Sequence, residues 1–251
     1  MADTPEDRGR RAMGLFRIGG IRISLDISWF IVFALVLFAL SAGYFPRSYP
    51  GYDTQTYWLA GFIATLLFFS SVLIHELSHS FMAIRCGIEI PEITLFIFGG
   101  VSKLSQEPKD PKTELKISVV GPLSSFVLAG IFGLIAKLLV GLPALLVAVF
   151  HYLSWINVAL VVFNLIPGFP LDGGRIFRAI WWWKTGSLIR ATKVATDLGK
   201  TFAVALMVLG ALQIFTGLLI SGLWLVFIGM FLRGMSERGY EIGRASCRER
   251  V

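Results

Sequence analysis

Charged side chains are scarce in this 251-residue chain, in which Asp, Glu, Lys and Arg make up 16% of the residues against 55% hydrophobic ones. A soluble globular domain carries about 25% charged residues, because water has to solvate its surface. The shortage of charge, together with a mean hydropathy of +0.73, excludes an ordinary soluble domain. It predicts an integral membrane protein with room for about five to seven spans.

Cysteine is scarcer still, since the chain has only Cys86 and Cys247. Two cysteines exclude a disulfide framework, and neither stands in a pair with metal-ligand spacing. The net charge of +7 does not indicate a nucleic-acid partner, because the cations are spread between apolar segments rather than gathered on one face.

Apolar runs separated by turn-rich or basic segments predict a six-helix transmembrane bundle, that is, an all-α integral membrane protein with small membrane-associated β-hairpins. The expected spans are residues 27–42, 57–84, 113–139, 144–166, 201–215 and 218–232. For the first run a cleaved signal peptide is the alternative, but its leader would be unusually long.

Two short segments, 15–24 and 93–104, each contain a Gly-Gly pair flanked by β-branched and aromatic residues. This pattern predicts a β-hairpin in each segment. The basic, Trp-bearing segment 175–200 between the fourth and fifth spans is typical of an interfacial helix.

The chain is expected to divide into a cytoplasmic N-terminal segment with a hairpin (1–26), a six-span core (27–235) and a C-terminal tail (236–251). Residues 245–251 continue no pattern and are interpreted as a cloning remnant. If the N-terminus is cytoplasmic, only the cations Arg47 and Lys137 fall on the opposite side. The positive-inside rule therefore predicts a cell-membrane protein with both ends in the cytoplasm.

The motif His75-Glu76-Leu77-Ser78-His79 lies inside the second apolar run. On a helix, His75 and His79 are one turn apart on one face and can bind a single zinc ion, with Glu76 beside them as a general base. HExxH alone is a modest signal, because it recurs by chance in soluble helices. Here a carboxylate within the membrane costs on the order of 3 kcal/mol unless it faces a metal, water or a protein interior.

A catalytic zinc commonly takes three protein ligands, and Asp172 is the leading candidate for the third. It follows a stretch, 164–171, in which prolines and glycines forbid a continuous helix, so irregular backbone is expected at Asp172, lining a cavity on the same side as His75. Asp26 and Asp53 are weaker candidates, because the first can cap the first span and the second lies toward the other face.

Two further polar residues belong to the fourth span. Asn164 can aim its amide at a scissile carbonyl or a developing oxyanion, with an interhelical hydrogen bond as the alternative. His151 lies several turns away and is expected to be an interior hydrogen-bonding residue rather than a ligand.

Taken together, these motifs resemble the site-2 protease family of intramembrane zinc metalloproteases. The resemblance covers roughly residues 14–235 and rests on the HELSH motif at 75–79, Asn164-x-x-Pro167 and Leu171-Asp172-Gly173, with Phe98-Gly99-Gly100 and Gly121-Pro122 in addition.

The resemblance implies zinc ligation by His75, His79 and Asp172, with Glu76 as the base and Asn164 as a substrate or oxyanion contact. It also implies one Zn²⁺ per chain and cleavage of peptide bonds within or near transmembrane segments. The expected partners are transmembrane protein substrates and the lipid bilayer. No nucleic-acid partner is expected.

The hairpin at 93–104, with Phe98, Gly99 and Gly100, is expected to hold an unwound stretch of substrate by strand addition. The alternative is that this hairpin only packs against the helices.

Two other functions are considered. A divalent-cation transporter could use the same metal site, but transport would need further ligands leading to both faces. A catalytically silent adaptor would not need Glu76. Many members of the family append a PDZ domain or CBS domains, and this sequence has neither, as expected of a core form or a truncation. No natural substrate, cleavage position or oligomeric state is predicted.

Overall fold

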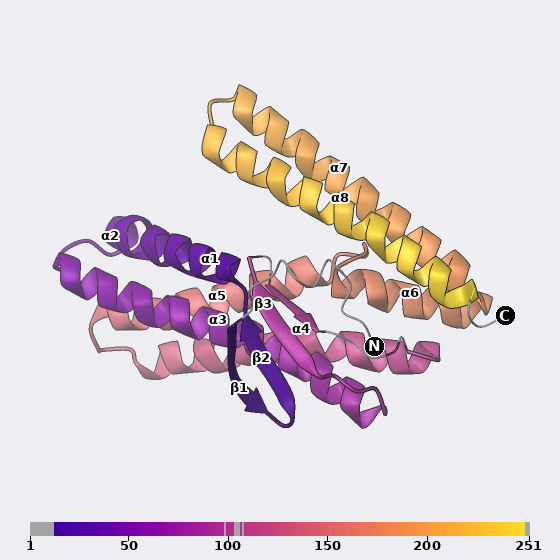
Figure 1. The fold of residues 1–251 in the computed structure, drawn as a ribbon. Coiled ribbons are helices and arrows are strands. Elements are labelled where there is room, and N and C mark those ends of the chain that lie inside the picture. Colours follow the sequence, from indigo (N-terminus) through magenta and orange to yellow (C-terminus); the bar gives the residue numbers. More distant parts are fainter. Residues whose placement is uncertain (1–12, 98, 103–105, 107, 249–251) are drawn as a thin grey trace. The chain divides into compact units, whose positions relative to one another are not determined.

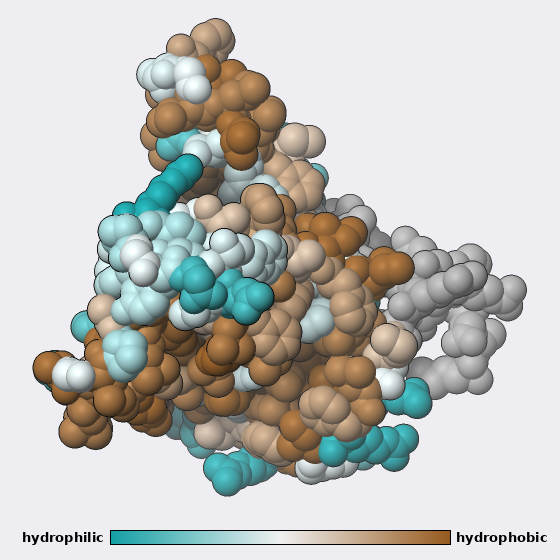
Figure 2. Space-filling model, turned by 90° about the vertical axis from the view of Figure 1, so that its left-hand side faces the viewer, coloured by the Kyte–Doolittle hydropathy of each residue, from teal (hydrophilic) through white to brown (hydrophobic). Residues whose placement is uncertain are grey.

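The computed structural model describes residues 13–97, 99–102, 106 and 108–248. Within them, six helices are long and apolar enough to cross a membrane: Ile27–Ser48, Thr54–Arg85, Pro111–Leu138, Ala144–Asn164, Leu188–Phe215 and Leu219–Glu237. Apolar residues cover most of the face drawn in Figure 2. The prediction of a six-span membrane protein is thus confirmed.

The chain forms two compact units, one made of residues 1–107 and 123–161 and the other of residues 108–122 and 162–251. Helices α4 (Pro111–Leu138) and α5 (Ala144–Asn164) contribute residues to both units.

In the first unit, α1 (Ile27–Phe38), the π-helical turn η2 (Ala39–Tyr44) and α2 (Phe45–Ser48) form the first span, and α3 (Thr54–Arg85) forms the second. Asp26 caps α1 as predicted, since its Oδ1 accepts a hydrogen bond from the Ser28 backbone N–H at 2.9 Å. Asp53 caps α3, and the hydrogen bond from the Thr56 hydroxyl lowers the pKa of its carboxyl.

The core of this unit gathers side chains from η2, α2, α3, α4 and α5. Its buried members are Leu40, Phe45, Tyr57, Ala60, Ala64, Phe132, Leu145, Ala148, Val149 and Leu153. Gly61 of α3 lets η2 approach closely, because a Cβ there would lie 3.2 Å from the Ser41 backbone nitrogen and closer still to its side chain.

Four strands form one sheet in the first unit: β1 (Met13–Ile18), β2 (Ile21–Leu25), β3 (Glu92–Phe96) and β4 (Gly99–Ser102), in that order (Figure 1). Both predicted hairpins are confirmed. They are not separate, however, because β2 and β3 pair in parallel. Parallel strands need a long crossover, which the chain provides through the first two spans.

In the second unit, α6 (Asp172–Thr185) is followed directly by α7 (Leu188–Phe215), so the single interfacial helix predicted at 175–200 was wrong. Gly186 ends α6 with a φ of +67°, and the Ser187 side chain caps α7 by accepting from the Arg190 backbone N–H. The fifth span therefore begins well before the expected residue 201.

Helices α7 and α8 (Leu219–Arg248) lie side by side as a hairpin (Figure 1). Glycines let the two backbones approach closely: a Cβ on Gly210 would lie 2.6 Å from the Gly222 carbonyl oxygen. Such packing by small residues is typical of helices that associate within a membrane.

Candidate metal centre

His75 and His79 meet on one face of α3, where both side chains are buried. Their Nε2 atoms are 3.2 Å apart. Two imidazoles on a tetrahedral zinc, with Zn–N distances of about 2.0–2.1 Å, place their nitrogens about 3.3 Å apart. The separation in α3 therefore fits two ligands of one zinc ion.

The ring of His75 is oriented by Ser125 of α4, whose Oγ lies 2.9 Å from Nδ1. Ser125 is fully buried. A partner on one ring nitrogen fixes the orientation of the ring and directs the other nitrogen to a metal. Sequence reasoning missed Ser125, for which the only signal was a polar residue inside the third span.

Glu76, the predicted base, is half-buried and lies against Gly100 of β4. A Cβ on Gly100 would lie 2.8 Å from the Glu76 carboxyl carbon and 3.3 Å from Oε2. The sequence suggested Gly99 and Gly100 only as substrate contacts, so this packing on the carboxylate is new. Phe98 lies outside the described residues.

Asp172 is the first residue of α6, after the N-cap Leu171, and its side chain is 9% exposed. The expectation that Asp172 itself sits on irregular backbone was therefore wrong: the irregular stretch is 165–171, and a helix begins at the aspartate. A helix N-terminus stabilises a carboxylate, because the first backbone N–H groups point toward it.

The two glycines after Asp172 let the irregular stretch fold back onto the first turn of α6. A Cβ on Gly173 would lie 2.5 Å from the Ile166 carbonyl oxygen, and one on Gly174 would lie 2.5 Å from that of Gly168. No larger residue fits at either position without moving backbone.

A buried ion pair connects α6 to the first turn of α4. The Arg178 Nε donates to Glu114 Oε1 at 2.7 Å, and Glu114 is fully buried. The sequence suggested Arg178 only as one of the cations of an interfacial helix. Among the residues that the structure describes, the second carboxylate oxygen of Glu114 has no hydrogen-bond partner, so Arg178 is the residue that offsets the buried charge of Glu114.

His75 and His79 of the first unit and Asp172 of the second can each offer one ligand atom to a metal ion, and all three are buried. Two imidazoles and one carboxylate, without sulfur, are a donor set typical of catalytic zinc. His151 is exposed on α5 rather than interior, so that prediction was wrong. Asn164 is the last residue of α5 and is half-buried.

A family model for Peptidase family M50 matches residues 63–148 and 142–209, a region that contains His75, His79 and Asp172. The chain belongs to this family. It is 38% identical to Rip3 of Mycobacterium tuberculosis over 226 residues, which are 89% of this chain and 57% of Rip3. The match to "Zinc metalloprotease MJ0392" of Methanocaldococcus jannaschii is also 38% identical, over 85% of this chain and 58% of that protein.

The M50 chain thus spans somewhat under three fifths of the length of these curated relatives. A solved structure, "Site-2 Protease from Methanocaldococcus jannaschii", superposes with a TM-score of 0.63 at 33% identity and covers 91% of this chain and 95% of its own. The chain therefore has the fold that the motifs predicted, that of a site-2 type member of family M50.

Proposed function

We propose that this protein is a zinc-dependent endopeptidase that cuts peptide bonds within or near transmembrane segments of membrane-protein substrates. The observation that carries the proposal is the 3.2 Å separation of the two buried Nε2 atoms, which fits zinc, in a helix long enough to cross a membrane. Membership of family M50 supports a peptidase rather than a transporter.

The proposal assigns zinc ligation to His75, His79 and Asp172. Bound there, zinc would polarise the scissile carbonyl and make water more acidic. His75 presents Nε2 because Ser125 holds its Nδ1. Asp172 brings a negative charge, which offsets part of the charge of the cation in a low-dielectric surrounding.

Glu76 is proposed to take a proton from the attacking water and to pass it to the leaving amine. Its position supports this assignment, because β4 closes one side of the carboxylate and limits where it can point. Asn164 is proposed to donate from its side-chain amide to the carbonyl oxygen on which negative charge develops.

Extended substrate is proposed to bind along β4, with Gly99 and Gly100 in contact with it. In the part of the chain that the structure describes, β4 is the last strand in the sheet order, and no described strand pairs with its outer edge. A substrate segment that adds there as a strand would satisfy backbone hydrogen-bonding groups that become free when a transmembrane helix unwinds.

The active site is proposed to lie toward the cytoplasmic side, with both termini in the cytoplasm. The bias of Lys and Arg supports this orientation, since only Arg47 and Lys137 fall on the opposite side. We further propose that residues 27–235 form the catalytic core, with 1–26 and 236–251 as its cytoplasmic flanks.

The test is reconstitution in liposomes with a membrane-spanning reporter, comparing wild type with Glu76→Gln. We expect wild type to cut the reporter in a zinc-dependent way and the variant to keep its zinc but not to cut. Cleavage by Glu76→Gln at the wild-type rate would remove Glu76 as the base. Zinc uptake into the liposomes without cleavage would favour a transporter.

A further inference from the structure

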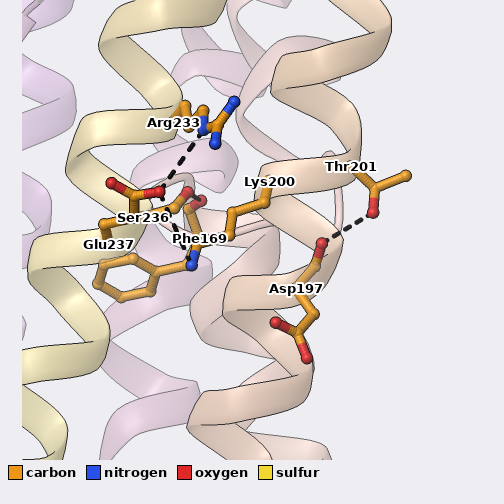
Figure 3. Close-up of polar contacts among 7 residues, drawn as sticks. All are labelled: Phe169, Asp197, Lys200, Thr201, Arg233, Ser236 and Glu237. Atoms are coloured by element: carbon orange, nitrogen blue, oxygen red, sulfur yellow. Dashed lines mark hydrogen bonds and ion pairs between the residues drawn. The ribbon is translucent and has the colours of Figure 1, made fainter.

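Phe169 lies in the irregular stretch 165–171 before Asp172, and three helices contact it. Its backbone N–H donates to the Ala195 carbonyl of α7 at 3.1 Å, and its own carbonyl accepts from the Ser236 hydroxyl of α8. Its ring lies under the Arg178 guanidinium of α6, 5.7 Å from the ring centre. Figure 3 shows Ser236 directed at Phe169 from α8.

The contact between Ser236 and Phe169 is enclosed by α7. Ser236 is fully buried. A Cβ on Gly199 would lie 2.8 Å from the Ser236 Oγ and 2.9 Å from the Phe169 backbone nitrogen. A glycine at 199 is therefore what leaves room for the hydroxyl and the carbonyl to meet.

The neighbouring ion pairs on the same turns are weaker restraints. Glu237 is 3.5 Å from Arg233 and 3.9 Å from Lys200, and all three side chains are more than a third exposed (Figure 3). Exposed pairs of this kind contribute about 0–1 kcal/mol. The first pair lies within α8 and the second joins α7 to α8, so neither reaches the stretch at 165–171, whereas the buried hydroxyl of Ser236 does.

A movement of Phe169 is expected to move Asp172 as well, because the two residues are close in the chain. Only two residues separate them in the chain, and Gly174 packs against the Phe169 backbone nitrogen and the Gly168 carbonyl. Because Gly173 and Gly174 bring this stretch into direct contact with the first turn of α6, a shift of the stretch toward α6 has to move that turn as well.

We propose that Ser236 and Gly199 are positioning residues that act through Phe169 on Asp172 and thereby set the zinc affinity of the protein. The inference rests on the proposed function, in which Asp172 is a zinc ligand. It makes the C-terminal helix α8 a determinant of the metal site, although none of its residues belongs to the ligand group.

The experiment measures the dissociation constant for zinc of the 251-residue protein in detergent, by competition with a chelator of known affinity. Ser236→Ala removes the hydrogen bond, and Gly199→Ala pushes against both partners. For each we expect about a tenfold loss of zinc affinity, in the range found for partners of metal ligands. Thermal unfolding of the metal-free proteins is recorded in parallel.

Two control variants separate positioning from general damage to the α7–α8 pair. Gly210→Ala introduces a similar backbone clash elsewhere between the two helices, with its Cβ 2.6 Å from the Gly222 oxygen. Glu237→Gln removes the exposed charge next to Ser236. Both controls are expected to bind zinc like wild type, even where Gly210→Ala unfolds at a lower temperature.

Asp172→Ala distinguishes failure of this inference from failure of the proposed function. If Asp172→Ala binds zinc like wild type, Asp172 is not a ligand and the proposed function fails. If Asp172→Ala weakens zinc binding while Ser236→Ala and Gly199→Ala do not, only the positioning role is overturned. If Ser236 acts through Asp172, the double variant Ser236→Ala/Asp172→Ala binds zinc as tightly as Asp172→Ala alone.

Discussion

Replacing Gly100 by alanine is expected to move the general base without unfolding the protein. Gly100 is paired with Leu95 in the β3–β4 hairpin and does not have a positive φ, so an alanine backbone fits there. Its new Cβ would overlap the Glu76 Cγ and lie 2.8 Å from the carboxyl carbon, where ordinary contact begins at 3.4 Å. The Glu76 side chain therefore has to move from Cγ outward, by roughly 1 Å.

The size of the effect follows from which atoms have to move. The contacted atoms belong to the Glu76 side chain and not to the backbone, so the side chain can rotate away, and the free energy of unfolding is expected to fall by about 1–3 kcal/mol, as at other overpacked sites. Catalysis is less tolerant, because a misplacement of about 1 Å can cost about 100-fold in rate. We expect the cleavage rate to fall by about 10- to 100-fold.

The assay for Gly100→Ala is turnover of a reconstituted transmembrane reporter, with the zinc content and thermal unfolding measured on the same preparation. Gly130→Ala is the matched control, since no atom lies within 4 Å of the Cβ it would add. Wild-type turnover by Gly100→Ala would refute the idea that β4 sets the position of Glu76. A parallel loss of zinc would show that the damage reaches the ligands.

Three further substitutions test other parts of the site. Ser125→Ala removes the partner of His75 Nδ1 and should weaken zinc binding by about 10-fold; unchanged affinity in a chelator competition would exclude an orienting role. Asp172→Ala should lower the zinc content of the purified protein, measured by mass spectrometry, and full occupancy would remove it from the ligand set. Glu114→Ala leaves Arg178 buried and unpaired and should cost about 3–5 kcal/mol of unfolding free energy; an unfolding curve like that of wild type would contradict this.

The spans, and the shared helix face of His75 and His79, could be predicted because both depend on local sequence. A run of apolar residues long enough to cross a bilayer has few other structures open to it, and two histidines four residues apart share a helix face whatever surrounds them. The two hairpins were predictable for the same reason, since each has β-branched and aromatic residues around a Gly pair, although only Gly19-Gly20 forms the turn itself and Gly99-Gly100 lies in β4.

Contacts between distant segments could not be predicted. The parallel pairing of β2 with β3 joins strands separated by two spans, and the contact of Gly100 with Glu76 depends on where the sheet meets α3. The sequence singled out Asp172 as a ligand candidate, which stays a prediction, but its place at a helix start was missed. The prolines and glycines before it indicate a break without indicating where the next helix begins.

X-ray absorption at the zinc edge tests the central claim most directly, because it reports the atoms bound to the metal. For purified wild type we predict two imidazole nitrogens at about 2.0–2.1 Å, oxygen in the remaining positions and no sulfur. His79→Ala should lose one imidazole from the spectrum. A sulfur ligand, or a spectrum that His79→Ala leaves unchanged, would contradict the account.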